Sequence, residues 1–510
     1  MQAFPWWSEE HRRLKEEIRR VVDGLVPRAE EAWWKREFPW DLVRVLADGG
    51  YFGVGIPKEY GGRGLGVVGT AIVGEEVFRL PGVGMGAFGA SMLGGVHQIY
   101  KFGTQEQRKR FLGRVAKGEL GAVAATEPFA GTDVAGMETV ARRDGKYYVI
   151  TGKKRFITGA GVASRYMLYA RTSDDPEDVR HYRHLTGFIV ERGMDGFRVE
   201  RINELIGVDN MYNGSLHLEE VRVPVENRIG EEGQGWQLMV TGFNYERVLC
   251  AVQAACLIRE CLRVVVPYGR RRIQFGRPTL ELPTNQMKVA DMLAKLRLAR
   301  LSAHYAAYLL DLDWEAAVDC SVSKLASTEM LTQVALEAVQ VMGGDGVTRF
   351  YPLERVLREA KIHEIAGGTS EAMKLLILRL GLKEVADELV MSYRVRHPEL
   401  RVPVPAPKPS ETRGEISEEA VLRVLADDYT VNPGLYMTPA DLCWRLGVAE
   451  GDWPRVEGAL LALEQKGWAK IYRKEGRTEL AKATYEGLRK AYPFEYYRWM
   501  PRWADENNVF

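Results

Sequence analysis

Residues 362–374 read IHEIAGGTSEAMK, and the adjacent glycines Gly367 and Gly368 in this stretch guide the interpretation of the whole chain. Glycine adopts backbone conformations that other residues avoid, and it lets the backbone approach a ligand closely. Thr369 and Ser370 follow, and then a helical pattern, so unpaired N–H donors are expected at the start of that helix. The stretch predicts a ligand-binding turn that carries no side chain able to accept a proton.

Length, composition and charge indicate an ordinary globular protein of several domains. The chain has 510 residues, of which 46% are hydrophobic and 27% are charged, and a domain commonly spans about 150 residues. A net charge of +1 provides no global attraction to nucleic acid or to an acidic membrane surface. The five cysteines form no CxxC pair, which favours reduced thiols in a cytoplasmic protein.

The sequence gives no sign of a targeting or membrane-spanning segment. The N-terminal stretch MQAFPWWSEEHRR is charged from Glu9 onward and lacks the apolar core of a signal peptide. No run of apolar residues reaches the 18 or so that a membrane-spanning helix needs. We therefore expect a cytoplasmic protein without a membrane partner.

Hydrophobic spacing changes twice along the chain and predicts an α+β protein. Helical stripes, such as Leu14, Ile18 and Leu25, fill an N-terminal helical domain at 1–120. Short alternating segments separated by turn residues predict a middle antiparallel β-domain at 121–229. Long helical patterns then return and predict a C-terminal helical bundle at 230–395.

A Pro-rich linker at 396–414 leads to a separate small domain at 415–510. Three helical patterns followed by a β-hairpin pattern make this domain resemble a winged helix. Residues 411–510 carry 14 Lys and Arg against 17 Asp and Glu, a net charge of −3. Duplex-binding domains present a clearer basic face. We therefore expect protein contact or oligomer packing rather than nucleic-acid binding, which stays open as the alternative.

Three motifs that suggest other functions lack the context those functions need. Residues 84–89 spell GxGxxG, but a helical pattern precedes them where a dinucleotide site needs a buried strand. The histidines show no HxxxH or HExxH spacing, so His304 and His363 are expected to have structural roles and no metal site is predicted. Gly152 and Lys153 precede Lys154 rather than the Ser or Thr of a phosphate-binding loop.

Four glycine-, hydroxyl- or arginine-rich segments suit phosphate recognition. They are ATEPFAGTD (125–133), RFITG (155–159), YGRRRIQFG (268–276) and QVMGGDG (340–346). Each one alone could be a surface loop. In this order, and with VRVPVENRIGEEGQGW, VADM and REAKIHEIAGGTSE, they resemble the acyl-CoA dehydrogenase family of flavoproteins from about residue 10 to residue 390.

The resemblance implies an N-terminal helical domain, a middle β-domain and a C-terminal four-helix domain. It also implies FAD bound between the subunits of a homodimer or homotetramer, an acyl-CoA substrate, and an electron-transfer flavoprotein as acceptor. The positions matching the family's FAD contacts are Val123, Ala125, Thr126, Gly131, Thr132, Phe156, Thr158, Arg272, Phe275, Gln340, Gly343, Gly344, Thr369 and Glu371. A glutamine common in the family is replaced by Pro283, so one FAD contact across the interface is expected to be lost or altered, although Gln286 is present.

The resemblance leaves open which residue is the base. The family reaction removes a proton from the acyl-CoA α-carbon, and most members use a glutamate in a Tyr-Glu-Gly-Thr turn. Here that turn reads Ala366-Gly367-Gly368-Thr369. A minority branch, which includes the isovaleryl-CoA and long-chain acyl-CoA dehydrogenases, carries the glutamate on a helix in a motif similar to Glu246-Arg247.

The local pattern independently singles out Glu246. It is the only acid between 233 and 259, and it interrupts an apolar row at helical spacing. A carboxylate in such a row is usually paired or functional, so we predict a catalytic base with a raised pKa; a structural pair with Arg247 is the alternative. Gly367 is expected to bind the thioester oxygen through its N–H group, and Thr132, Arg247 and Gly368 are expected to contact the substrate.

Two other functions share the same motifs. An acyl-CoA oxidase differs in the rapid reaction of its reduced flavin with air, and a flavin-binding scaffold or regulator retains the fold without dehydrogenase activity. The sequence fixes neither the length nor the branching of the acyl chain.

Overall fold

The computed structural model describes residues 3–385, 414, 416–431 and 436–492. Backbone contacts divide the chain into two compact units, Met1–Val390 and Met391–Phe510, called here the large unit and the small unit. The linker expected at 396–414 lies outside the described residues apart from Gly414.

The large unit begins with helices whose apolar faces were predicted from their spacing. Helix α1 (Glu9–Lys35) starts where the Ser8 side chain accepts the His11 backbone N–H, and it buries Leu14 and Ile18. Helices α2 (Trp40–Asp48) and α3 (Gly66–Val77) follow. The helical segment at 105–116 is interrupted. A π-helical turn, η3 (Arg108–Leu112), separates α6 (Gln105–Gln107) from α7 (Gly113–Ala116).

The GxGxxG segment is a buried π-helical turn, η2 (Gly84–Gly89), and helix α3 precedes it. Its glycines permit close backbone packing. A Cβ on Gly86 would lie 3.0 Å from the Met211 Cα, and one on Gly84 would lie 2.7 Å from the Phe78 Cα. The segment therefore packs the N-terminal helices and has no preceding strand of the kind a dinucleotide fingerprint needs.

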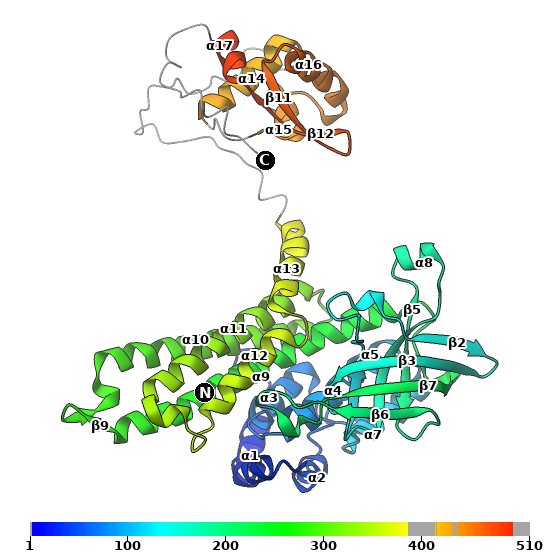
Figure 1. Cartoon of the computed structure of the whole chain (residues 1–510), viewed down its shortest axis with the longest axis vertical. Helices are drawn as coiled ribbons and strands as arrows, with labels where there is room; N and C mark the ends of the chain where they lie inside the picture. Colours follow the sequence, from blue (N-terminus) through cyan, green and yellow to red (C-terminus); the bar gives the residue numbers. More distant parts are fainter. Residues whose placement is uncertain (1–2, 386–413, 415, 432–435, 493–510) are drawn as a thin grey trace. The chain divides into compact units, whose positions relative to one another are not determined.

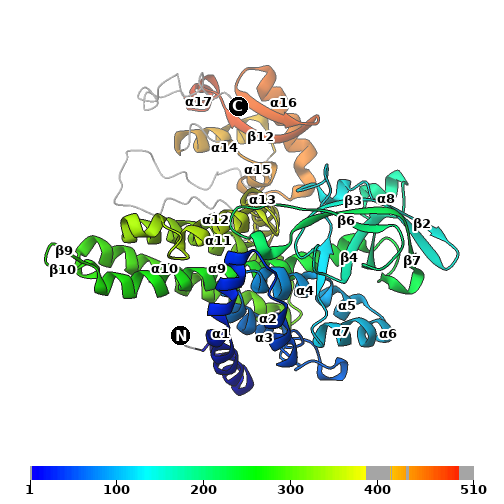
Figure 2. The same ribbon diagram turned by 60° about the horizontal axis from the view of Figure 1, so that its bottom comes forward.

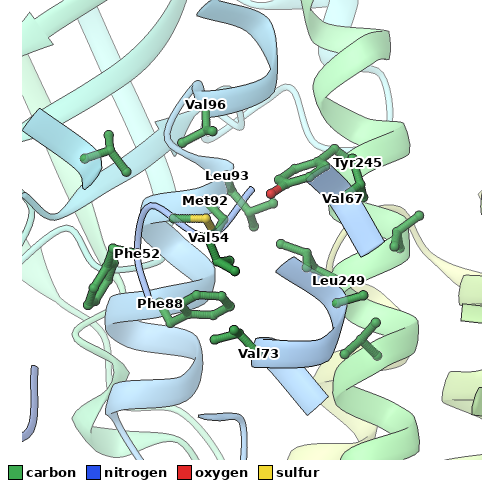
Figure 3. Close-up of a cluster of buried hydrophobic side chains, with 14 of the residues drawn as sticks. Phe52, Val54, Val67, Val73, Phe88, Met92, Leu93, Val96, Tyr245 and Leu249 are labelled. Carbon is green, nitrogen blue, oxygen red and sulfur yellow. The ribbon is translucent and has the colours of Figure 1, made fainter. Parts of the chain in front are cut away.

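A layer of apolar side chains joins the N-terminal helices to the bundle. Phe88 of η2, Met92 of α4 (Ala90–Leu93) and Val96 of α5 (Val96–Phe102) face Tyr245 and Leu249 on the long helix of the bundle (Figure 3). All five side chains are buried. This layer fixes the long helix, and hence its polar side chains, against the N-terminal part of the large unit.

A cluster of buried charges joins α1 and α3 to α9 and α10. On α3, Glu75 accepts from Lys15, Arg300 and His304, and its neighbour Glu76 accepts from Lys15 and Arg259. His304 therefore has the structural role predicted for it.

The middle β-domain is one eight-stranded sheet, in the order β6-β7-β3-β2-β4-β5-β8 with β1 paired to β4. The sheet lies at one end of the large unit (Figure 2). The strands are β1 (Gly121–Ala124), β2 (Val140–Asp144), β3 (Tyr147–Ile157), β4 (Arg165–Arg171), β5 (Leu185–Glu191), β6 (Phe197–Ile202), β7 (Gly214–Pro224) and β8 (Arg228–Ile229).

The prediction of an antiparallel domain is wrong at two places. β1 pairs parallel to β4, and Val140 of β2 pairs parallel to Arg171 of β4. A parallel pair needs a long connection between its strands, and the β2–β3 hairpin within residues 125–164 provides one between β1 and β4.

The bundle of the large unit consists of α9 (Gly235–Arg271), α10 (Pro283–Asp311), α11 (Ala317–Met342) and α12 (Leu353–Ile365), followed by α13 (Ser370–Glu384) (Figure 1). A short hairpin of β9 (Ile273–Gln274) and β10 (Arg277–Pro278) joins α9 to α10, and a 3-10 turn, η8 (Gly343–Val347), ends α11. Pro283 is the first residue of α10, a position that tolerates its missing N–H.

The small unit contains the elements that the sequence predicted. Three helices, α14 (Glu418–Val431), α15 (Pro439–Leu446) and α16 (Trp453–Gln465), precede a hairpin of β11 (Ala469–Lys474) and β12 (Arg477–Ala483). Met437 adds a bridge to Ala481, and α17 (Tyr485–Ala491) follows. A core of its own, formed by residues such as Val421, Leu460 and Leu488, is buried between these elements.

Among the described residues, no helix is both long enough and apolar enough to cross a membrane.

Candidate active site

The helix α9 brings Glu246 against the Gly-Gly turn between α12 and α13. A Cβ built on Gly367 would lie 3.5 Å from the Glu246 Cγ and 3.6 Å from its Oε1. The same Cβ would lie 3.3 Å from the Cys250 Sγ, one turn further along α9. The Glu246 carboxyl therefore lies where a side chain at position 367 would begin.

The surroundings of Glu246 keep its carboxyl without a partner. Within the part of the chain that the structure describes, Glu246 makes no hydrogen bond and no salt bridge, and Arg247 donates instead to Asn244 Oδ1 at 2.9 Å. Burial raises the pKa of Glu246 to about 7, although the charges of Arg247 and Lys324 act in the opposite direction. This geometry counts against a structural Glu246–Arg247 pair.

Both glycines of the turn adopt conformations that other residues rarely reach. Their φ angles are +68° at Gly367 and +102° at Gly368. Thr369 caps α13, because its hydroxyl accepts the Ala372 N–H at 3.2 Å. The neighbouring position Glu371 is exposed in the first turn of α13.

A lysine that the sequence analysis missed donates hydrogen bonds to the backbone of this turn. Lys324 of α11 is fully buried, and its Nζ donates to the carbonyl oxygens of Glu364 at 3.0 Å and of Gly368 at 2.6 Å. The sequence does contain a signal for a buried lysine. Lys324 is the single cation in CSVSKLAST (320–328), a helical stretch of small and hydroxyl-bearing residues that is expected to pack closely against a neighbouring helix.

The first group of predicted flavin contacts lies together at the ends of β1 and β3. Val123 is in β1, and the loop that follows it is tied to β3 because the Arg155 N–H donates to the Thr126 carbonyl at 2.8 Å. Gly131 and Thr132 are exposed further along this loop. Thr158, just after β3, accepts from Asn213 Nδ2 at 3.4 Å.

A buried ion pair supports the same loop. Lys154 of β3 donates to Glu127 Oε1 at 2.7 Å and to the Ala125 carbonyl at 3.2 Å. Both Glu127 oxygens also accept backbone N–H groups, from Glu138 and Thr139. The loop is thus anchored at Ala125 and Glu127, while Gly131 and Thr132 face solvent.

Phe156 has an unusual backbone for an aromatic residue. Its φ is +59°, and the pairing of β3 with β7 shifts between Lys154 and Ile157. A β-bulge of this kind redirects a side chain; the Phe156 ring is half exposed and the Arg155 guanidinium lies over it, 4.5 Å from its centroid. Strained backbone of this kind is common at ligand sites.

The second group of predicted flavin contacts lies at the far end of the bundle. Arg272 and Phe275 are exposed at the β9–β10 hairpin, and Gln340, Gly343 and Gly344 are exposed where α11 ends. The two segments meet because the Tyr268 hydroxyl donates to Asp345 Oδ2 at 2.5 Å.

The two groups lie at opposite ends of the large unit. In both orientations the β9–β10 hairpin is at one end of the bundle and the sheet is at the other (Figures 1 and 2). The chemistry of both groups fits FAD: hydroxyls, an arginine, and the backbone of Gly131, Gly343 and Gly344, where an added Cβ would meet nothing within 4 Å. One chain does not bring the two groups together.

A cavity of about 610 Å³ lies beside the candidate site but is separate from it. It is lined by Tyr245, His97, Val96 and Asp311, and neither Glu246 nor Gly367 lines it. Burial lowers the pKa of His97 to about 4, so its ring is neutral.

The described residues contain no group of three or more His, Cys, Asp or Glu side chains arranged to hold a metal ion. His363 is buried on α12, and burial lowers its pKa to about 4.

Comparison with known proteins places the large unit in one family. Residues 8–119, 122–221 and 233–382 match the N-terminal, middle and C-terminal domains of acyl-CoA dehydrogenase. The mitochondrial isovaleryl-CoA dehydrogenase of Solanum tuberosum is 34% identical over 383 residues, which cover 74% of this chain and 92% of the relative.

Two solved structures show the same architecture. Butyryl-CoA dehydrogenase from Megasphaera elsdenii superimposes with a TM-score of 0.71 at 29% identity, covering 75% of this chain and 100% of the other. The FAD and proline complex of PigA superimposes with a TM-score of 0.70 at 26% identity over the same shares. The chain belongs to the acyl-CoA dehydrogenase family, which consists of FAD-binding flavoprotein oxidoreductases.

Proposed function

We propose that this protein catalyses the FAD-dependent α,β-dehydrogenation of an acyl-CoA thioester to the trans-2-enoyl-CoA, with Glu246 as the base. The observation that carries the proposal is the unpaired carboxyl of Glu246 against Gly367, the position at which most relatives carry their glutamate. A base is most effective when its pKa lies near the working pH, and burial raises the pKa of Glu246 to about 7.

Each residue of the site has a distinct part in this reaction. Glu246 removes the proton from the α-carbon, and the Gly367 N–H donates to the thioester oxygen, which stabilises the negative charge that develops there. Gly368, Arg247 and Thr132 complete the substrate contacts. FAD, when bound, supplies the acceptor for the β-hydrogen and its electron pair.

Anaerobic bleaching of the flavin by a panel of acyl-CoAs tests the proposal. We expect bleaching in the wild type and a loss of about 10³-fold in its rate in Glu246→Gln, the usual scale for removing a base. Glu364→Gln is the matched control, because Glu364 is beside the same turn but its carboxylate is occupied by Thr332 and Lys361. Equal bleaching in wild type and Glu246→Gln would place the base elsewhere.

The same experiment separates the alternatives. Bleaching followed by rapid recolouring in air indicates an oxidase, and slow recolouring indicates a dehydrogenase with a protein acceptor such as an electron-transfer flavoprotein. Bound FAD that no acyl-CoA reduces would favour a scaffold or regulator.

We infer that the functional form is a homodimer or homotetramer. The two groups of flavin positions are separated within one chain, so a second copy is needed to complete a site. An exposed apolar stripe on α13 supports self-association: Leu375, Leu378 and Leu382 follow helical spacing and are 68%, 56% and 49% exposed. At Pro283, the FAD contact that the family's glutamine makes across the subunit interface is proposed to be lost or differently made.

We also propose domain boundaries at 1–120, 121–229 and 230–395 in the large unit, with a linker at 396–414 and a winged-helix domain from 415. Support comes from the order of three helices and a hairpin and from the bridge between Met437 and Ala481. The proposed role of the domain is protein contact or oligomer packing, and tight salt-sensitive binding of DNA by it would contradict this. The cytoplasm is the proposed location.

A further inference from the structure

At Gly367 and Gly368, the turn has no side chain that could restrain its backbone conformation. Both residues are glycines, and the Thr369 hydroxyl is engaged by the N–H of Ala372. The contacts that restrain the turn come from α11, where the Lys324 ammonium group bonds the carbonyl oxygen of Glu364 on one side and that of Gly368 on the other. The two bonds bracket Gly367.

Lys324 is an unusual choice if its role is to make two hydrogen bonds. It is fully buried and, among the residues that the structure describes, it forms no salt bridge. A buried ammonium group without a carboxylate partner is costly, whereas a neutral amide could donate to the same two carbonyls. The charge therefore points to a use beyond restraining the backbone.

The ionisable groups that act on this charge lie on α9 and α12. Glu246, Arg247 and Cys250 of α9 and His363 and Glu364 of α12 interact electrostatically with Lys324. The Glu364 carboxylate is occupied by Thr332 and Lys361. Cys250 is a protonated thiol, because burial raises its pKa to about 12. Glu246 is therefore the carboxyl in this set that is left without a partner.

We propose that Lys324 is a positioning residue of the site: it holds the carbonyls of Glu364 and Gly368 so that the Gly367 N–H faces the substrate oxygen, and its charge favours the ionised form of Glu246. This inference rests on the proposed function for its catalytic meaning. Lys324 itself does not contact the reacting atoms.

Three variants of the FAD-loaded protein separate the two roles of Lys324. Lys324→Met removes both the charge and the donors, and Lys324→Gln removes the charge but keeps a donor. Lys361→Met is the matched control, because this exposed lysine also contacts Glu364, but through its carboxylate. Retained FAD and an unchanged melting temperature establish which variants fold.

Two measurements are made without substrate. Hydrogen exchange of the peptide covering 362–370 should become roughly tenfold faster or more in Lys324→Met, as expected when a turn loses its hydrogen bonds, and change little in Lys324→Gln. Infrared titration of the Glu246 carboxyl, identified by its absence in Glu246→Gln, should show a midpoint about one pH unit higher in both Lys324 variants. Lys361→Met should match the wild type in both.

An unchanged midpoint in both Lys324 variants would overturn the electrostatic role, and unchanged exchange in Lys324→Met would overturn the restraint of the turn. Failure of both variants to fold while Lys361→Met folds would also overturn the proposal, in favour of a purely structural lysine. Because no acyl-CoA is present, these outcomes hold even if no acyl-CoA reduces the flavin, which is how failure of the proposed function would be recognised.

Discussion

At the residue scale, the position of Glu246 explains why the turn contains glycine. A side chain at 367 would begin 3.5 Å from the Glu246 Cγ and 3.3 Å from the Cys250 Sγ. A second carboxylate there would also face the first, and two carboxylates that share a site cannot both ionise easily. If Glu246 is the base, as proposed, a glycine at 367 keeps a second carboxylate out of its space.

A double-mutant cycle tests this exclusion. We expect Gly367→Glu alone to lower both the activity and, by about 1–3 kcal/mol, the stability, because it crowds Glu246. Glu246→Gly alone should lose flavin reduction by acyl-CoA. The double variant should recover part of that reduction, since the carboxylate returns to the same space from the turn. Additive losses in the double variant would contradict the shared space.

The raised pKa of Glu246 also predicts how the stability of the protein changes with pH. Its folded pKa of about 7 lies above the ordinary value of 4.5, so the folded protein holds this proton more tightly than the unfolded chain does. Stability from this group is therefore fully present below about pH 4.5, falls as the pH rises, and is lost above about 7. Glu246→Gln should be more stable than the wild type at pH 8, by about 3 kcal/mol, and equal to it near pH 4.

Urea unfolding of the FAD-loaded proteins across this pH range measures the difference. Glu364→Gln is a control in which the change in stability with pH should have the opposite sign. Burial acts to raise the pKa of Glu364, but hydrogen bonds from Lys361 and Thr332 outweigh it and lower that pKa. This variant should therefore lose stability at neutral pH and regain it in acid. A pH-independent effect of Glu246→Gln would argue against a raised pKa.

Sequence reasoning at this scale could find Glu246 but not the contacts that Lys324 makes. Glu246 is visible because it interrupts an apolar row within one helix, and such a row is a local pattern. The contacts of Lys324 depend on α11 packing against a turn that lies 40 and 44 residues further along the chain. Periodicity carries no information on a contact of that range.

At the element scale, the Lys154–Glu127 pair should control the order of the loop at 125–139. Lys154→Met leaves the Glu127 carboxylate buried without its cation, which commonly costs about 3–5 kcal/mol. We expect faster hydrogen exchange in this loop and weaker retention of FAD on gel filtration. Lys153→Met is the control: Lys153 is the adjacent lysine, and it pairs with Glu200 on the surface at 3.2 Å, so little should change.

The glycines of η2 allow a prediction about packing. A Cβ on Gly86 would meet the Met211 Cα at 3.0 Å, so Gly86→Ala should destabilise the large unit by about 1–3 kcal/mol. Gly24 lies in α1 with open space around it, so Gly24→Ala should instead stabilise by about 0.5–1 kcal/mol. Thermal unfolding of the two variants checks the opposite signs, and equal effects would contradict the close approach of η2 to Met211.

Most elements were predictable because their hydrophobic periods are local. The strand pairing was harder. Strand β3 (Tyr147–Ile157) runs into the RFITG segment, with an irregularity in its pairing before Ile157. The parallel pairing of β1 with β4 depends on which strands meet across the sheet, and alternation along a strand does not specify its neighbour.

At the scale of the whole molecule, the predicted flavin contacts divide into two halves that lie far apart in one chain. The first half, with Gly131 and Thr158, lies at the sheet, and the second, with Arg272 and Gly344, lies at the far end of the bundle (Figure 1). Motifs in a sequence predict both halves but do not indicate that a single chain separates them. If each FAD is bound by the first half of one subunit and the second half of another, two subunits that are defective in different halves can together form one intact site.

Complementation between subunits tests this arrangement. Gly131→Asp places a negative charge in the first half and Arg272→Ala removes the cation from the second, so each variant alone should lose FAD. Co-expressed, they form mixed dimers in which one of the two sites is intact, so FAD should recover to about a quarter of the wild-type content if subunits pair at random. Sedimentation with differently tagged subunits confirms that mixed oligomers form, and two Arg272→Ala subunits with different tags are the control without an intact site. Mixed oligomers that bind no more FAD than either variant would show that each site is built within one chain, and the separation of its two halves would then require a different explanation.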